Sequence, residues 1–248
     1  MSKTVLLGVC LASYFGMSSH LFARETRKAA AASYVELGDK WASIGDFTRA
    51  IKTYGIALQF APDFAPAYFK RGWARQQNGD LSDAIADFSK TLEIIPQCAE
   101  AFANRAYIYA QLEENDKALS DWASALEINP RLTTAFYNRA NFRLNQGDPE
   151  GALADFDQVL QTDPAYAMAY NNRGIAKLVQ GNIEGAIADF NRAIKIDSHR
   201  AEPYANRGLV RLQQGNKKEA DRDFARSVAL NPSARTFIER RIVEITRR

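Results

Sequence analysis

Aromatic and small apolar residues recur along this chain of 248 residues at a constant interval of 34 residues. The aromatic members are Tyr54, Phe88, Trp122, Phe156, Phe190 and Phe224. Each has an alanine four residues before it: Ala50, Ala84, Ala118, Ala152, Ala186 and Ala220. Residues four apart share one face of an α-helix, so each pair predicts a helix that buries this face. A repeat of this length indicates an array of similar structural units.

A second aromatic series predicts another helix in every unit, ahead of the first. Its members are Tyr34, Tyr68, Phe102, Phe136, Tyr170 and Tyr204. A small residue follows each by four positions: Gly38, Gly72, Ala106, Ala140, Gly174 and Gly208. Small side chains let a neighbouring helix approach closely, so we expect the two helices of a unit to pack tightly against each other.

Turn residues separate these helices at regular positions. Within a unit, Gly-Asp or Gly-Asn pairs end one helix and cap the next at Gly45, Gly79, Gly147, Gly181 and Gly215. The third unit has Glu113 and Glu114 at this place instead. Prolines close the units at Pro62, Pro96, Pro130, Pro164 and Pro232, with Ser198 in the fifth.

These positions resemble the tetratricopeptide repeat, which has an aromatic and then a small residue in its first helix, glycine at the turn, alanine and an aromatic in its second helix, and a final proline. The resemblance covers residues 31–234. It implies an all-α fold, a right-handed α-solenoid (superhelix) of antiparallel helix pairs. The six repeats are expected at residues 31–64, 65–98, 99–132, 133–166, 167–200 and 201–234.

The segment after the last repeat, residues 235–248, places Ile238, Ile242 and Ile245 on one helical face. We expect a C-terminal capping helix, because the last unit of a solenoid otherwise exposes apolar surface. The alternative is a basic amphipathic helix that binds an anionic membrane surface, since this segment contains five arginines and two glutamates.

The first 23 residues have the pattern of a targeting segment. Lys3 precedes an uncharged apolar run, residues 4–17, which is short for a transmembrane helix. We expect residues 1–23 to be a signal peptide or an N-terminal membrane anchor, and residues 24–30 to be a linker or the start of the first helix. An organelle transit peptide is a further alternative. The protein is therefore expected to be exported (periplasmic, secreted or lumenal) or anchored to a membrane by its N-terminus.

Charged residues recur with the repeat. An arginine in the first helix is followed sixteen residues later by an aspartate in the second helix in repeats two to six. The pairs are Arg71 and Asp87, Arg105 and Asp121, Arg139 and Asp155, Arg173 and Asp189, and Arg207 and Asp223. Repeat one has Leu37 and Thr53 at these places, so both members are absent together. We expect structural ion pairs across each helix hairpin, although the arginines could also hold an acidic ligand.

An asparagine precedes the arginine in repeats three to six: Asn104, Asn138, Asn172 and Asn206. The family resemblance implies that this position faces a concave groove, where an amide can bond a peptide main chain in both directions. The predicted groove also contains Phe69, Trp73, Tyr107, Tyr137, Asn141, Met168, Asn171, Ile175 and Leu209. The alternative is that each asparagine bonds an adjacent helix.

Composition removes several classes of function. The net charge is +3 and no basic stripe alternates with aromatic residues, so we expect no nucleic-acid binding. The two histidines, His20 and His199, have no visible catalytic partner, and no metal-binding or nucleotide-binding motif occurs. We therefore expect no enzyme, no metal site and no cofactor.

The sequence predicts a non-enzymatic scaffold or adaptor that binds a peptide segment or a partner protein in its groove. A structural subunit or assembly factor of a membrane-associated complex, using the convex face or the ends, is the alternative, and a homo-oligomer is possible. Lys70 is the one groove cation that the pattern places in repeats two to six, so the family's carboxylate clamp for chaperone tails is not expected.

Overall fold

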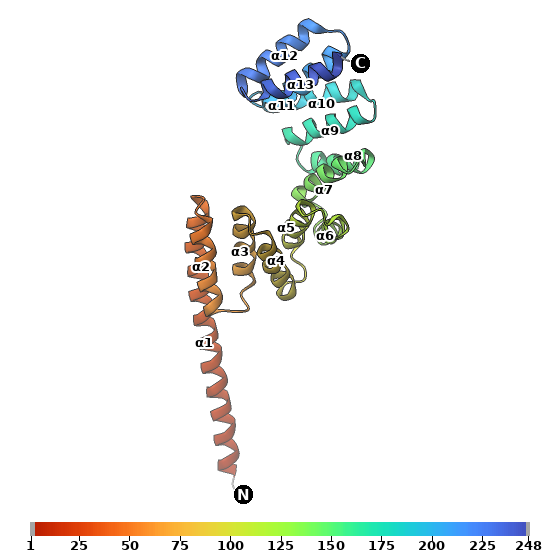
Figure 1. Ribbon diagram of the computed structural model, residues 1–248. Coiled ribbons are helices and arrows are strands. Elements are labelled where there is room, and N and C mark those ends of the chain that lie inside the picture. Colours follow the sequence, from red (N-terminus) through yellow and green to blue (C-terminus); the bar gives the residue numbers. More distant parts are fainter. Residues whose placement is uncertain (1–2, 247–248) are drawn as a thin grey trace. The chain divides into compact units, whose positions relative to one another are not determined.

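The computed structural model describes the backbone of residues 3–246 and the side chains of residues 23–246. This part of the chain forms thirteen α-helices and no strand (Figure 1). The helices of the first half are α1 (Lys3–Ser43), α2 (Phe47–Phe60), α3 (Ala65–Asn78), α4 (Leu81–Ile94), α5 (Ala99–Gln111) and α6 (Asn115–Ile128). Those of the second half are α7 (Thr133–Asn145), α8 (Pro149–Thr162), α9 (Ala167–Val179), α10 (Ile183–Ile196), α11 (Ala201–Gln213), α12 (Lys217–Leu230) and α13 (Ala234–Thr246).

The chain divides into two compact units, Met1–Ile128 and Asn129–Arg248, here called unit 1 and unit 2. Unit 1 contains three antiparallel helix pairs, α1 with α2, α3 with α4, and α5 with α6. Unit 2 contains three further pairs, α7 with α8, α9 with α10, and α11 with α12, followed by α13. The all-α architecture of antiparallel helix pairs agrees with the prediction from the 34-residue period.

Each helix pair packs a small residue of its first helix against the aromatic of its second helix. A Cβ atom on Gly174 would lie 2.7 Å from Cε1 of Phe190, and one on Gly208 would lie 2.6 Å from Cε1 of Phe224. Phe190 is completely buried, so its ring has no room to yield. Glycine at this position therefore permits the close approach of the two helices.

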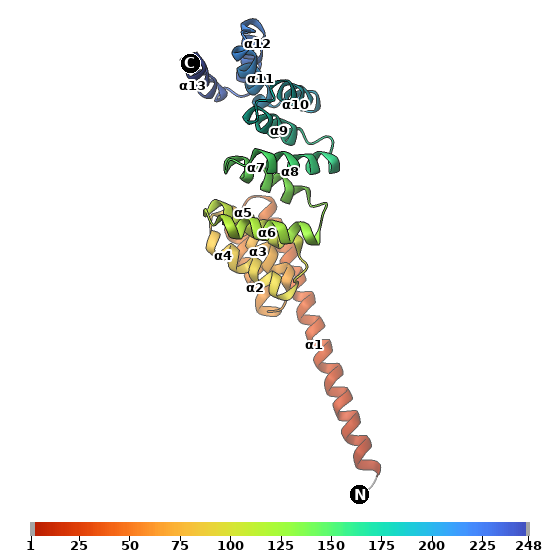
Figure 2. The ribbon, with the colours of Figure 1, turned by 90° about the vertical axis from the view of Figure 1, so that its right-hand side faces the viewer.

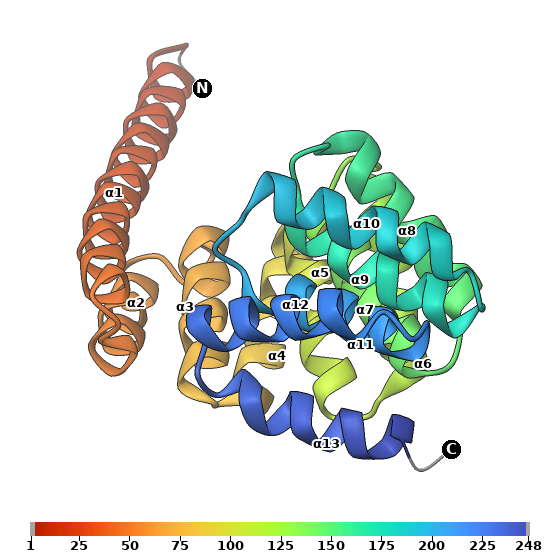
Figure 3. The ribbon, with the colours of Figure 1, turned by 90° about the horizontal axis from the view of Figure 1, so that it is seen from above.

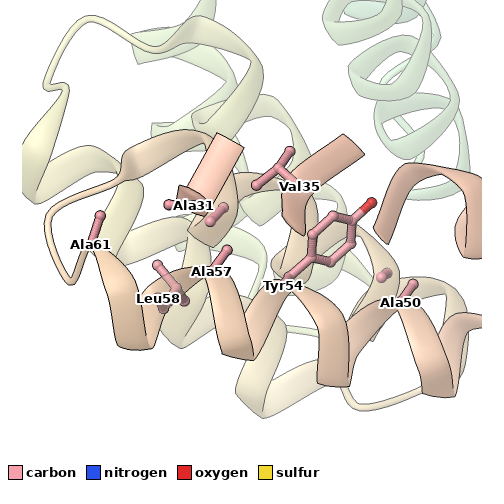
Figure 4. Close-up of a cluster of buried hydrophobic side chains, with 9 residues drawn as sticks. Ala31, Val35, Ala50, Tyr54, Ala57, Leu58 and Ala61 are labelled. Atoms are coloured by element: carbon pink, nitrogen blue, oxygen red, sulfur yellow. The ribbon is translucent and has the colours of Figure 1, made fainter. Parts of the chain in front are cut away.

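The core of the first repeat shows this packing in detail (Figure 4). The ring of Tyr54 lies between α1 and α2 among small and aliphatic side chains, including Ala31, Val35, Ala50 and Ala57. Its hydroxyl donates a hydrogen bond of 2.7 Å to Oδ1 of Asp39. The repeat thus keeps a tyrosine where the others have phenylalanine or tryptophan, because Asp39 satisfies the buried hydroxyl.

The turns inside the helix pairs need a left-handed backbone conformation. Gly45, Gly79, Gly147, Gly181 and Gly215 all adopt φ angles between 78° and 89°. In the third repeat Glu113 takes the same place with φ 60°, a conformation that costs more for a residue with a Cβ atom. Side-chain oxygens of Asp46, Asp148 and Asn182 then cap the helices that follow, as the Gly-Asp and Gly-Asn pairs predict.

The backbone of α1 is one continuous helix from Lys3 to Ser43 and runs far beyond its partner α2 (Figure 1). Residues 24–30 belong to this helix and lead directly into the first repeat. The predicted leader lies mostly among residues 1–22, whose side chains are outside the described part. Within the described residues, none of the helices combines the length and apolar character that a membrane crossing requires.

The last helix, α13, packs against unit 2 through its isoleucines. Ile238 is buried, and Ile242 and Ile245 contact the cluster of Ala205, Leu209, Ala220 and Phe224 on α11 and α12. Helices α9 and α11 pack mainly on the second helix of the preceding pair, whereas α13 packs more on α11 than on α12. In Figures 2 and 3 α13 is accordingly set off from α12. The predicted cap is thus present, but it leans towards the side of the first helices.

Candidate functional site: an amide-lined groove in unit 2

The five predicted arginine–aspartate pairs are joined by two hydrogen bonds each. In every pair, Nε and Nη2 of the arginine donate to the two carboxylate oxygens over 2.6 to 2.9 Å. The aspartates are buried and the arginines are largely so. This bidentate geometry matches the planar guanidinium to the carboxylate and holds the two helices of a repeat together.

A second cation, which the sequence reasoning missed, reaches four of these aspartates from one helical turn further on. Asp87 also binds Arg75, Asp155 binds Arg143, Asp189 binds Lys177, and Asp223 binds Arg211, at 2.6 to 2.9 Å. The spacing of four residues from the first arginine was the available signal. In repeat three Tyr109 holds this place, and its ring lies 5.8 Å from the guanidinium of Arg105.

The same arginines are engaged on their remaining sides. Each guanidinium lies 5.3 to 5.7 Å from the ring of the aromatic three residues earlier, as with Arg173 above Tyr170. Nη1 of Arg173 also donates to Asp157 of the preceding repeat over 2.6 Å. The hydrogen bonds to Asp189, and then to Asp157, raise the pKa of Arg173 above its usual value. These arginines therefore act as internal ties, and their charges are already satisfied.

The amides of the predicted groove form one chain of hydrogen bonds in unit 2. Asn206 Nδ2 donates to Asn171 Oδ1 over 3.0 Å, and Asn171 Nδ2 donates to Asn172 Oδ1 over 2.9 Å. Asn172 Nδ2 donates to Asn141 Oδ1 over 2.7 Å, and Asn141 Nδ2 donates to the carbonyl oxygen of Tyr137 over 2.9 Å. All four bonds point in the same direction, so each polarises the next. The chain links α11, α9 and α7.

Both ends of this chain retain hydrogen-bonding capacity. Asn206 Oδ1 accepts no bond from the described residues, and this residue lines two cavities. At the other end, the Tyr137 hydroxyl oxygen accepts a 3.0 Å bond from Asn172. Burial raises the pKa of Tyr137, so its hydroxyl keeps its proton at neutral pH. The network thus offers an acceptor at Asn206 and an O–H donor at Tyr137.

The other two asparagines of the predicted row behave differently. Asn104 in unit 1 and Asn138 in unit 2 are half-buried and make no hydrogen bond within the described chain. The residues that stand where Asn172 finds its acceptors are Trp73 and Phe69 in the case of Asn104, and neither ring offers a side-chain acceptor. The row therefore contains two amides bound to a neighbouring helix and two whose groups are open.

The remaining predicted groove residues divide between the two units. Trp73 and Tyr107 in unit 1 are each 38% exposed, which is unusual for such large rings. The edge of Trp73 contacts Phe47, with the ring centroids 5.7 Å apart. Lys70 is not a free cation, because its Nζ lies 2.7 Å from Asp39 of the preceding repeat.

Three adjoining cavities form a groove in unit 2, here called the unit 2 groove. The first, of about 140 Å³, lies among Tyr137, Met168, Asn171, Asn172, Arg200, Glu202 and Pro203. The second, of about 380 Å³, shares Asn171 and Glu202 with it and reaches Ser227 and Phe237. The third, of about 550 Å³, shares Ile175, Asn206 and Phe237 with the second. Four predicted residues, Tyr137, Asn171, Asn172 and Ile175, line it.

The third cavity differs from the first in chemistry. Aliphatic side chains of α9, α11 and α13 surround it, among them Ile175, Leu178, Leu209 and Ile245. Phe237 and Arg241, one turn apart on α13, complete the wall. The sequence reasoning had assigned α13 to capping and missed these two residues, although their spacing of four residues placed them on one face.

No combination of three or more His, Cys, Asp and Glu side chains in the described part of the chain is arranged to hold a metal ion. The side chains that line the groove are instead amides, aliphatic and aromatic groups, with few charges. Such a surface can bond a peptide main chain and enclose apolar side chains.

Helix pairs of 34 residues that stack in series define a helical-repeat protein built of hairpins. The chain matches the tetratricopeptide repeat family at residues 29–97, 69–132, 137–201 and 201–233. It therefore belongs to the tetratricopeptide repeat family.

Several solved structures share this fold. MamA is 23% identical with a TM-score of 0.59, over 68% of this chain and 92% of its own. YrrB, described as a TPR protein with an unusual peptide-binding site, is 26% identical with a TM-score of 0.54, over 66% of this chain and 85% of its own. PilW, a type IV pilus biogenesis factor, is 20% identical with a TM-score of 0.74, over 82% of this chain and 94% of its own. No curated protein matches the chain at a significant level.

Proposed function

We propose that the protein is a non-enzymatic adaptor that binds a peptide segment of a partner protein in the unit 2 groove. The observation that carries the proposal is the directed amide chain from Asn206 to Tyr137, which lies along three adjoining cavities. Membership of a repeat family that acts as a scaffold supports it, as does the peptide-binding site described for YrrB.

The amide chain suits main-chain recognition. A backbone N–H of the ligand can donate to the open Oδ1 of Asn206, and a backbone carbonyl can accept from the Tyr137 hydroxyl. Neither bond depends on the ligand's side chains, so they fix its path without selecting its sequence. Because the amides already hold each other, the ligand finds them oriented and little side-chain entropy is lost on binding.

Affinity purification from the native cell tests the proposal. The full chain and its variants are used as bait, and captured proteins are compared. Asn138→Ala is the sharpest single change near the groove, because it removes an amide that makes no internal hydrogen bond. Asn172→Ala and Asn206→Ala also break bonds between helices, so their folding is checked by circular dichroism. Asn145→Ala, an exposed amide at the end of α7, is the matched control.

The expected result is that a partner bound by the wild type and by Asn145→Ala is lost or strongly reduced in the groove variants. Capture of the same partner by all variants would contradict the proposal. It would favour the alternative of a structural subunit that assembles through its outer surface or its ends.

We propose further that the protein works outside the cytoplasm or at a membrane. The support is the uncharged run at residues 4–17, which precedes the repeats. N-terminal sequencing of the protein from its native cell tests this, because a mature chain that starts near residue 24 indicates cleavage. Recovery of an intact N-terminus from the soluble cytoplasmic fraction would contradict the proposal.

The C-terminal helix supports the adaptor over the membrane-surface alternative. Ile238, Ile242 and Ile245 pack on α11 and α12, so the apolar face of α13 is occupied by the protein itself. Membrane binding through this face would require α13 to detach and expose the cluster that it covers.

A further inference from the structure

The third cavity of the unit 2 groove is here called the α13 chamber, since α13 supplies one of its walls. It exists because α13 leans on α11 instead of continuing the stack on α12. Within the wall, Phe237 is 40% exposed although it is large and apolar. Val179 and Ile183, at the turn between α9 and α10, are exposed apolar residues on the same cavity. An apolar chamber of this kind gains most from a bulky hydrophobic occupant.

The charges around the chamber favour an acidic occupant. Arg241 is the only charged residue that lines it in the described structure. The surrounding sequence, residues 167–248, has 16 Lys and Arg residues but only 9 Asp and Glu residues. Two of those acids, Asp189 and Asp223, are buried and each is paired with two cations. Unit 2 therefore presents a positive field to a ligand that approaches this end.

Arg241 is available for exchange. Its Nη1 lies 2.6 Å from Oε2 of Glu244, three residues along α13, and both side chains are half exposed. An exposed ion pair of this spacing is weak in water, so a ligand carboxylate can replace Glu244 or share the guanidinium with it. The opposite end of the groove carries Glu202 near Arg200, and its charges balance. The acidic part of a ligand is thus directed to α13.

We propose that the α13 chamber selects partner segments in which bulky apolar side chains stand next to aspartate or glutamate. The apolar side chains lie between Leu209 and Phe237, the carboxylate meets Arg241, and a backbone N–H extends the amide chain at Asn206 Oδ1. This inference rests on the proposed function and adds a side-chain preference to the main-chain binding described above.

Three fluorescein-labelled peptides of equal length test the proposal by fluorescence anisotropy with the full chain. The first combines leucine and phenylalanine with glutamate, the second has lysine in place of glutamate, and the third has serine in place of the apolar residues. We expect the first to bind at least about tenfold more tightly than either of the others, because both the chamber and the charge contribute. Equal or tighter binding of the lysine peptide, or no binding of the first peptide, would overturn the proposal.

Two variants locate the binding. Phe237→Ser is expected to weaken the first peptide about tenfold, as expected for a central anchor, and Arg241→Glu is expected to reverse the charge preference. Phe60→Ala and Arg222→Glu are matched controls, because Phe60 is an equally exposed aromatic in unit 1 and Arg222 is an exposed cation of α12 outside the chamber. Equal effects of Arg241→Glu and Arg222→Glu would reduce the preference to net charge and refute a site.

The outcomes separate this inference from the proposed function. If the native partner is lost from the asparagine variants but is retained by Phe237→Ser and Arg241→Glu, the groove binds peptides and the chamber preference is wrong. If anionic vesicles bind the wild type and not Phe237→Ser, the surface recognises membrane and the proposal also fails. Circular dichroism of each variant confirms that α13 remains folded.

Discussion

Arg139 of α7 holds Asp155 of α8 through two parallel hydrogen bonds, Nε to Oδ2 at 2.9 Å and Nη2 to Oδ1 at 2.7 Å. Arg143 donates to the same carboxylate at 2.9 Å. One buried acid therefore neutralises part of two cations and joins both helices of repeat four. Its removal leaves two guanidinium groups without their partner.

Asp155→Asn should destabilise the protein strongly. The amide has the size of the carboxylate, but it carries no charge and cannot accept both bonds from Arg139. Loss of one partner of a buried pair costs about 3–5 kcal/mol, and partial exposure of the arginines places this variant near the lower value. Chemical denaturation of the full chain measures it. The control Glu93→Gln, in an exposed pair with Lys90, should change the free energy of unfolding by less than about 0.5 kcal/mol.

Two glycine-to-alanine changes should have opposite signs. In Gly174→Ala the new methyl group would lie 2.7 Å from the buried ring of Phe190, and such overpacking costs about 1–3 kcal/mol. In Gly55→Ala the nearest atom is Nη1 of Arg71 at 3.9 Å, so the change should stabilise α2 by roughly 0.5–1 kcal/mol. Thermal unfolding compares the two variants. A stabilised Gly174→Ala protein would show that the helices can separate without cost.

The stability that Tyr54 contributes should disappear at high pH. Burial, and then the hydrogen bond to the Asp39 carboxylate, raise the pKa of Tyr54 above its ordinary value of about 10. Below pH 10 the folded and unfolded chains both keep the proton, so the contribution is constant. Above it only the unfolded chain releases the proton, and the free energy of unfolding falls by up to about 1.4 kcal/mol per pH unit.

Urea denaturation of the wild type and Tyr54→Phe between pH 8 and pH 11 isolates this effect, because the other tyrosines cancel in the difference. The wild type should be more stable at pH 8 and lose this advantage as the pH rises past 10. A difference that stays constant across the range would mean that the Tyr54 hydroxyl is not held in the folded state.

Ile238→Ala should destabilise the C-terminal repeat by about 2–4 kcal/mol. Its side chain is 3% exposed and fills the space between α13 and the cluster of Leu209 and Phe224, so truncation leaves a cavity. Val243→Ala, on the 44% exposed side of the same helix, should change stability by less than about 0.5 kcal/mol. Hydrogen exchange of α11 and α12 amides should report the loss locally. Equal effects of the two changes would show that α13 is not a cap.

The repeats could be read from the sequence because one packing solution is used six times. An aromatic such as Phe190 and a small residue such as Gly174 recur at every equivalent position, so chance matches cancel and the period remains. The arginine and aspartate pairs could be predicted for the same reason. Their second cations have the spacing of one helical turn, but one repeat carries Tyr109 there, which obscured the pattern.

The amide chain could not be predicted, because it depends on which neighbour can accept a bond. Asn172 finds its acceptor in Asn141, 31 residues earlier, whereas Asn206 meets Ile175 at that spacing and bonds Asn171 instead. The α13 chamber escaped prediction for another reason. Residues after the last repeat have no repeated template, and the lean of α13 towards α11 follows from packing alone.

The bond between Lys70 and Asp39 joins the same two positions of successive repeats as the bond between Asn172 and Asn141. Modules in tandem arrays are prone to unequal recombination, which removes or duplicates whole units. Loss of repeat two would set Asn104 against Asp39 and exchange a salt bridge for a neutral contact, while the apolar packing would remain nearly unchanged. The polar contacts between successive repeats therefore act as an address for each module, and they make the order of the array a heritable property distinct from its fold.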